Sequence, residues 1–132
     1  MAIGDITLET PTTISTNTIL YPSSDTIDTD KAFISWTEDT PGFAMKTGVV
    51  DASTDPPTLG SINTISTTGQ YNLAARVQDT DKFIQFYESR DPSTYSYVEI
   101  GTASGTTITS YTRSEVDQNN PVQLQVVALS AT

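Results

Sequence analysis

The stretch Asp79-Thr80-Asp81-Lys82-Phe83-Ile84-Gln85-Phe86-Tyr87 decides the fold, because its beginning repeats an earlier part of the chain. Asp28-Thr29-Asp30-Lys31 precedes it by 51 residues (79 − 28 = 51). The same offset relates Thr13-Ile14-Ser15-Thr16 to Thr64-Ile65-Ser66-Thr67. Agreement of separate blocks at one offset indicates an internal repeat, and a period of about 50 residues is typical of propellers and solenoids.

The repeat predicts about two and a half copies within a single domain. The third occurrence of the pattern is Thr107-Ile108, which takes the place of Thr58-Leu59 at a spacing of 49 residues (107 − 58 = 49). The domain is expected to span 1–132, with repeats at approximately 19–67 and 70–116 and partial copies at 1–18 and 117–132.

Each copy is expected to hold four antiparallel strands, separated by turns such as Pro41-Gly42 and Asp91-Pro92-Ser93. The many threonines, β-branched and stiff at χ1, favour strands, and no segment shows sustained helical periodicity. The strands are predicted at 71–78, 82–88, 95–102 and 106–113, and in the first copy near 18–21, 31–37, 43–50 and 58–65. The predicted fold class is all-β, with antiparallel four-stranded blade-like units in tandem.

The strand after each Asp-Thr-Asp-Lys sequence is apolar on both faces. In the first copy Trp36 points to one side and Phe33 to the other, and in the second copy Phe83 opposes Phe86. A strand that is apolar on both faces lies in a sheet that is covered on both sides. Without helices, another sheet must supply each cover, which indicates propeller-like or sandwich packing.

The aromatic residues fall into two groups. Trp36 and Tyr87 correspond at the 51-residue offset and lie on a buried strand, so we expect them to be core residues. Phe43, Tyr95 and Tyr97 are the binding or interface candidates, because aromatic faces suit both sugar rings and subunit contacts.

The charge excludes several partners. The chain has 16 acidic and 6 basic residues and a net charge of −10. Nucleic acid and anionic membrane attract basic proteins, so neither is an expected partner.

The chain contains no Cys and no His, so no thiolate or imidazole can bind zinc, copper or iron. The serines lack a histidine base, and the acid pairs Glu38-Asp39 and Glu88 with Asp91 lie in turns where solvation explains them. The Asp-Thr-Asp sequences suit turns better than a calcium loop. We therefore expect no enzymatic activity, no catalytic residue, no metal site and no cofactor.

The sequence 79–87, the tyrosine-rich strand after it and Ile100–Thr109 together resemble tandem β-propeller-like repeats found in structural proteins of marine bacteriophages and in bacterial surface proteins. The resemblance covers 70–113 and, more loosely, 19–67. It implies a structural protein of a virion, such as a capsid decoration (cement) or head-fibre subunit. The alternatives are a carbohydrate-binding propeller lectin, which would bind a glycan, and a bacterial surface or filament subunit.

The expected partners follow from the repeat number. Two and a half copies do not close a ring, so we expect a homo-oligomer, with a trimer of two blades per subunit as the expected size. The other expected partner is the major capsid protein or another virion protein. The resemblance implies a location on the virion surface. Because the N-terminus shows no secretion signal, we expect synthesis in the host cytoplasm. The strand-like ends 1–18 and 121–132 either add to neighbouring sheets or pair with each other.

Overall fold

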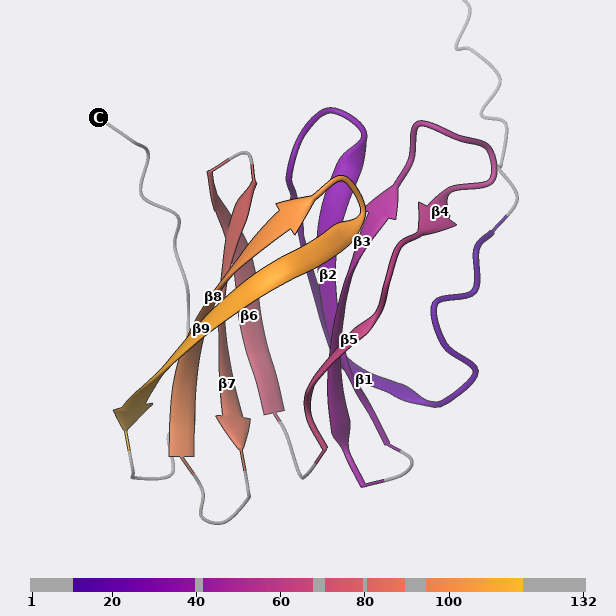
Figure 1. Cartoon of the computed structure of the whole chain (residues 1–132). Coiled ribbons are helices and arrows are strands. Elements are labelled where there is room, and N and C mark those ends of the chain that lie inside the picture. Colours follow the sequence, from indigo (N-terminus) through magenta and orange to yellow (C-terminus); the bar gives the residue numbers. More distant parts are fainter. Residues whose placement is uncertain (1–10, 40–41, 68–70, 80, 90–94, 118–132) are drawn as a thin grey trace, which may run out of the picture.

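The computed structural model describes residues 11–39, 42–67, 71–79, 81–89 and 95–117, in which every regular element is a β-strand (Figure 1). The prediction of an all-β chain with antiparallel sheets is confirmed. The N-terminal sheet contains β1 (Ile19–Thr26), β2 (Lys31–Glu38), β3 (Ala44–Asp51), β4 (Thr58–Leu59) and β5 (Asn63–Ser66). The C-terminal sheet contains β6 (Tyr71–Asp79), β7 (Lys82–Ser89), β8 (Tyr95–Ser104) and β9 (Thr107–Asp117).

The offset of 51 residues also relates the strand registers of the two sheets. In the β2–β3 hairpin Lys31 pairs with Asp51, and in the β7–β8 hairpin Lys82 pairs with Thr102 (82 − 31 = 51 and 102 − 51 = 51). The irregularity between Leu20 and Ser23 in β1 has a counterpart between Asn72 and Ala74 in β6. The two halves of the chain therefore pair their strands in the same way.

One backbone contact repeats as well. The amide of Ala52 donates to the carbonyl of Asp30, and the amide of Ala103 donates to the carbonyl of Asp81, both at 2.7 Å. Each bond ties the end of the second strand of a hairpin to the Asp-Thr-Asp-Lys turn. The turn sequence therefore fixes the start of β2 and of β7 in the same way.

The first strand is longer than the predicted 18–21. It continues through Pro22 to Thr26, because the register shift between Leu20 and Ser23 places Pro22 where no ladder hydrogen bond is required of it. Tyr21 has a φ of 50°, which marks the same irregularity.

The predicted strand 58–65 is wrong as a single element. It is split into β4 and β5 around Gly60, whose amide donates to the carbonyl of Val49 at 2.9 Å. A Cβ on Gly60 would lie 2.0 Å from the carbonyl oxygen of Thr106, in the turn between β8 and β9. The chain bends where the other sheet approaches it, and glycine allows that approach.

The strand expected over 1–18 is absent from its described part, 11–18, which is irregular. Ser15 Oγ accepts from the amide of Asn17 at 3.1 Å, a local turn that competes with strand pairing. Residues 1–10, and the partial copy expected at 117–132 beyond Asp117, lie outside the described residues.

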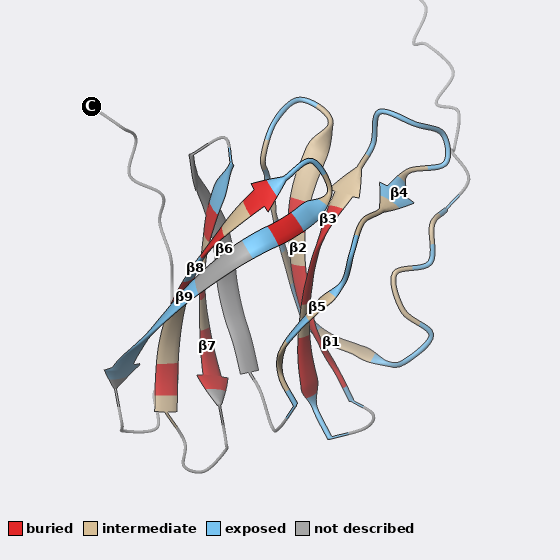
Figure 2. Ribbon diagram, in the orientation of Figure 1, coloured by how far each residue is buried: buried red, intermediate tan, exposed pale blue. Residues whose placement is uncertain are grey.

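The hydrophobic core lies between the two sheets, where the buried parts of β2, β3, β7 and β8 are found (Figure 2). The rings of Phe33 and Phe83 stack with centroids 4.0 Å apart and an angle of 18° between their planes. Val49, Ala103 and Ile108 complete this cluster. Since Phe33 belongs to β2 and Phe83 to β7, the core joins the two repeats rather than lying within either one.

Gly101 provides a test of this packing. It pairs with Phe83, and a Cβ added to it would lie 2.0 Å from Cζ of that ring. We expect Gly101→Ala to destabilise the fold by about 1–3 kcal/mol in urea unfolding, because the Phe83 ring would have to leave the core stack. The control is Gly48→Ala, whose Cβ would lie 3.2 Å from the flexible end of Leu59 and at ordinary contact distance, 3.9 and 4.0 Å, from Ser61 and Trp36. Equal midpoints for the two variants would contradict this packing.

Candidate functional site

A polar cluster lies next to the core, on the face of the C-terminal sheet that meets the N-terminal sheet. Its centre is Glu99 on β8, whose side chain is 3% exposed. The Glu99 carboxylate accepts hydrogen bonds from Gln85 Nε2 and Tyr87 Oη, each at 3.0 Å. Arg113 on β9 donates its Nε to the same carboxylate at 2.7 Å, forming an ion pair. Three strands therefore converge on one buried carboxylate.

Arg113 connects this cluster to the other sheet. Its Nη2 donates to the carbonyl of Ile65 in β5 at 3.0 Å. Its guanidinium carbon lies 5.5 Å from the ring centroid of Tyr87 and 5.3 Å from that of Tyr97, within the range of cation–π attraction. Arg113 therefore joins the two sheets at the part of their interface where the Glu99 cluster lies.

The protonation states fit a structural role. Burial, together with the negative charge of Glu99, raises the pKa of Tyr87 well above its ordinary range. Burial alone would lower the pKa of Arg113, but the hydrogen bond to Glu99 and the electrostatic attraction of Tyr87, Glu99 and Tyr97 together outweigh burial and raise the pKa. At neutral pH Tyr87 therefore donates a hydrogen bond to Glu99, and Arg113 is a cation paired with the same carboxylate.

The candidate aromatic residues differ in burial and in the contacts that they make. Trp36 is 2% exposed and Tyr87 is 0% exposed. Tyr97 stacks on Tyr87 with centroids 5.5 Å apart, and Tyr95 lies 6.3 Å from Tyr97 and is half-buried. Phe43, between β2 and β3, is 41% exposed and has a φ of 59°.

Sequence reasoning missed Glu99 and Arg113. A signal was present, because Glu99 lies on the same inward face of β8 as Tyr97 and Gly101, two residues away on either side. A charged residue on a buried face needs a partner. The pairing with Arg113 follows from the β8–β9 register, in which the two residues lie opposite each other.

Glu38 is a second buried carboxylate, at the end of β2 on the face of the N-terminal sheet away from the C-terminal sheet. The prediction that Glu38 and Glu88 lie in turns and are explained by solvation is wrong, because both are buried within strands. Glu38 accepts hydrogen bonds from Ser15 Oγ at 2.7 Å, Asn17 Nδ2 at 3.1 Å and Trp36 Nε1 at 3.3 Å. Burial acts to raise the pKa of Glu38, but these donors outweigh it and lower the pKa below its ordinary value of 4.5. Ile14 and Trp36 line a cavity of about 350 Å³ beside this cluster. Residues 11–17 thus form a cover over this face of the sheet.

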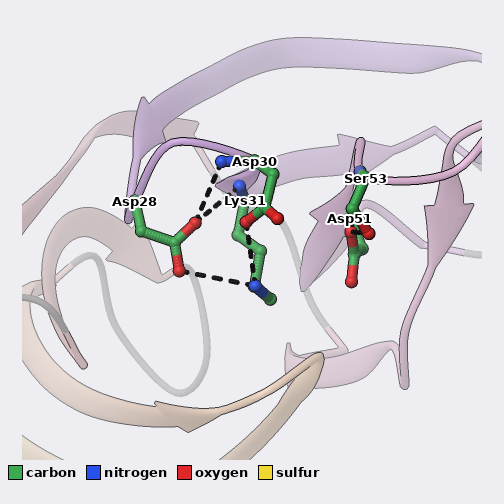
Figure 3. A network of polar contacts seen from close by, with 5 residues as sticks. All are labelled: Asp28, Asp30, Lys31, Asp51 and Ser53. Carbon is green, nitrogen blue, oxygen red and sulfur yellow. Dashed lines mark hydrogen bonds and ion pairs between the residues drawn. The ribbon is translucent and has the colours of Figure 1, made fainter.

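The Asp-Thr-Asp-Lys turn of the first repeat is held by its own side chains (Figure 3). Asp28 Oδ1 accepts from the amides of Asp30 and Lys31 at 3.1 and 2.9 Å, and the Asp30 amide is the main cause of the lowered pKa of Asp28. Lys31 Nζ lies 3.4 Å from Asp28 Oδ2 and 2.9 Å from Asp30 Oδ1. These contacts are those of a turn closed by an aspartate side chain, as expected for the Asp-Thr-Asp sequence. In the described part of the chain, no group of three or more His, Cys, Asp or Glu residues could hold a metal ion.

Comparisons with known proteins give no assignment. No known protein family, curated protein or solved structure matches this chain. Within the described ranges, no helix is long and apolar enough to cross a bilayer.

The ion pair of Arg113 can be tested by substitution. Arg113→Met removes the cation from Glu99 and leaves a buried carboxylate with only neutral donors. We expect a loss of about 1–3 kcal/mol in unfolding free energy, measured in urea. The control is Lys46→Met, which removes an exposed hydrogen bond to Thr64 and the smallest of the interactions that lower the pKa of Glu38, and it should cost no more than about 0.5 kcal/mol. An Arg113→Met protein as stable as the Lys46→Met protein would contradict the proposed role.

Glu38 predicts a dependence of stability on pH. Its pKa is lower in the folded protein than in the unfolded chain, so the unfolded chain binds the proton more readily. The stabilisation is therefore present above pH 4.5 and is lost as the pH falls through the lowered pKa. We expect Glu38→Gln to lower the melting temperature at pH 7, and the difference from wild type to shrink at about pH 3. If the melting temperatures of the two proteins differ equally at both pH values, the charge of Glu38 does not contribute to stability.

Proposed function

We propose that this chain is a non-enzymatic structural protein of a virion, a capsid decoration (cement) or head-fibre subunit that works as a homo-oligomer. The observation that carries the proposal is the burial of the repeated aromatic residues, since Trp36 and Tyr87 are 2% and 0% exposed. A sugar-binding repeat protein would present such equivalent aromatics in open clefts. Here they serve packing, and the resemblance of 79–87 and 100–109 to phage structural repeats supplies the class of protein.

Among the residues whose burial the structure describes, the exposed aromatics Tyr21 and Phe43 have no aromatic counterpart in the other repeat. Tyr21 and Phe43 are 45% and 41% exposed. At the 51-residue offset they correspond to Asn72 and Thr94. The lectin alternative would require a glycan site built once rather than in each repeat, so the structural role is the better supported of the two.

Two features support self-association. Large apolar side chains are exposed on strands of both sheets and in the loops beside β3 and β5: Tyr21, Phe43, Ile62, Ile100 and Val116. β9 pairs only with β8 among the described strands and so presents an edge to which another chain can add. Propeller-like packing is part of the proposal, since three copies would bring together six sheets, within the usual number of blades.

The charge supports a protein partner of opposite sign. A net charge of −10 on 132 residues gives a negative field that favours a shell surface rich in Lys and Arg. The proposed partner is the major capsid protein, or another virion protein, on the outside of the assembled particle. Such binding weakens as salt screens the charges.

Two measurements test the proposal. Native mass spectrometry should find an oligomer, with a trimer as the expected species. Ile100→Asp should shift more of the protein from the oligomer to the monomer than Thr107→Asp does, where Thr107 is an exposed polar control on the next strand. The protein should co-sediment with shells of its own virus at low salt and be released at high salt. A stable monomer that ignores those shells and binds a glycan array would refute the assignment in favour of the lectin.

A further inference from the structure

The contact between the two sheets can be carried forward by one repeat. Phe33 of β2 stacks on the C-terminal sheet, and the buried Ser35 lies on the same face of β2. Their counterparts at the 51-residue offset are Ile84 and Phe86 of β7 (33 + 51 = 84 and 35 + 51 = 86). Because these two alternate with the buried Phe83, they lie on the outward face of the C-terminal sheet. That face is the counterpart of the face that the N-terminal sheet turns to the core.

The same relation holds in the other direction. Gln85 and Tyr87 are buried on the inward face of β7, and their counterparts in β2 are Ile34 and Trp36 (85 − 51 = 34 and 87 − 51 = 36). Ile34 and Trp36 alternate with Phe33, so they lie on the outward face of the N-terminal sheet. The two outward faces of the molecule are therefore the counterparts of the two faces that meet in its core.

The outward face of the C-terminal sheet is apolar. Ile84 and Phe86 on β7 pair with Ile100 and Val98 on β8. Ile100 is 41% exposed and the other three are half-buried. A contiguous apolar patch of this kind marks an interaction surface.

The outward face of the N-terminal sheet contains the cavity of about 350 Å³. Its apolar walls come from β1, from β2 and from the cover formed by residues 11–17: Ile14, Ile19, Pro22, Ile34 and Trp36. An apolar cavity of about 150 Å³ is enough to hold a benzene molecule. This cavity therefore has room for the ring of a phenylalanine.

The polar cluster of the core interface has apolar counterparts on this face. Glu99 corresponds to Gly48, and Gln85 corresponds to Ile34 (99 − 51 = 48 and 85 − 51 = 34). Gly48 pairs with Ile34 just as Glu99 pairs with Gln85. Where the C-terminal sheet carries a carboxylate, the N-terminal sheet thus carries no side chain. The face suits an apolar partner that is larger than the one the C-terminal sheet receives.

The cover formed by residues 11–17 accounts for part of this face. At the 51-residue offset it corresponds to 62–68, which includes β5. The C-terminal sheet is contacted both by β5, through the carbonyl of Ile65, and by β2, through Phe33. The cover supplies the counterpart of β5, whereas nothing in the described ranges supplies the counterpart of β2 on the N-terminal sheet.

We propose that a second copy of this chain supplies it: β7 of one copy docks on the outward face of the N-terminal sheet of the next, with the Phe86 ring in the cavity beside Ile34 and Trp36. Phe86 takes the place that Ser35 takes within the chain, and the cavity gives the larger side chain room. The proposal rests on the homo-oligomer proposed above and specifies its interface. Two different faces meet, so the contact is heterologous and leads to a ring or a filament.

Single-cysteine variants test which faces meet, because the chain contains no cysteine of its own. Phe86→Cys is refolded from urea together with Ser24→Cys, where Ser24 is an exposed residue that lines the cavity, and the mixture is oxidised mildly. We expect a disulfide between the two variants, identified by peptide mapping. It should form in about tenfold higher yield than with Ser104→Cys, an exposed serine outside the cavity, since a disulfide requires Cα atoms within about 7 Å.

Ile84→Cys replaces Phe86→Cys if circular dichroism shows that the loss of Phe86 unfolds the sheet, and it should favour Ser24→Cys in the same way. A predominant disulfide between two Phe86→Cys subunits would show that the face pairs with itself and would overturn the proposal. Equal yields with Ser24→Cys and Ser104→Cys, or no disulfide with either, would overturn it as well.

Native mass spectrometry of the unmodified chain separates failure of this interface from failure of the proposed function. An oligomer whose variants do not form the mixed disulfide would reject the contact of Phe86 with the cavity and leave the homo-oligomer standing. A monomer would reject both, and binding to shells is measured independently of either result.

Discussion

The stack of Phe33 on Phe83 is the contact on which the rest of the structure depends. Each ring comes from the strand that follows an Asp-Thr-Asp-Lys turn, and each belongs to a different sheet. A four-stranded sheet with two apolar faces cannot bury both by itself, so the core arises only when one repeat lies against the next. Gly101 beneath Phe83 lets the ring lie flat against β8, and this brings the two sheets close enough for the other core side chains to meet.

The polar end of the interface complements this apolar end. Apolar contact alone would permit the sheets to slide, whereas Glu99 requires Gln85, Tyr87 and Arg113 at set distances. Arg113 then reaches β5 of the other sheet through the carbonyl of Ile65. We infer that the aromatic stack supplies most of the stabilisation and that the ion pair fixes how the sheets are aligned.

Much of the fold could be predicted because strand order and register are properties of the repeat. The offset of 51 found in the sequence is the offset that relates Lys31–Asp51 to Lys82–Thr102 in the hairpins. The break at Gly60 could not be predicted, since its cause is the carbonyl of Thr106 in the other sheet. The bond from Arg113 to Ile65 and the cover of Trp36 by residues 11–17 also join parts of the chain that no local pattern relates. The aromatic pattern predicts Tyr87 and Tyr97 as notable residues, but it carries no information on Glu99 and Arg113, which hold these rings in place through contacts between strands.

The central claim is that neither sheet is stable without the other. Trp36 is the single tryptophan and lies in the N-terminal sheet, so its fluorescence reports on that sheet, whereas circular dichroism reports on both. The decisive measurement is urea unfolding of Phe83→Ala, a change in the C-terminal sheet alone, followed by both signals. The account predicts that both transitions move together to lower urea and remain coincident. A fluorescence transition that stays at the wild-type midpoint while the dichroism splits into two steps would contradict it.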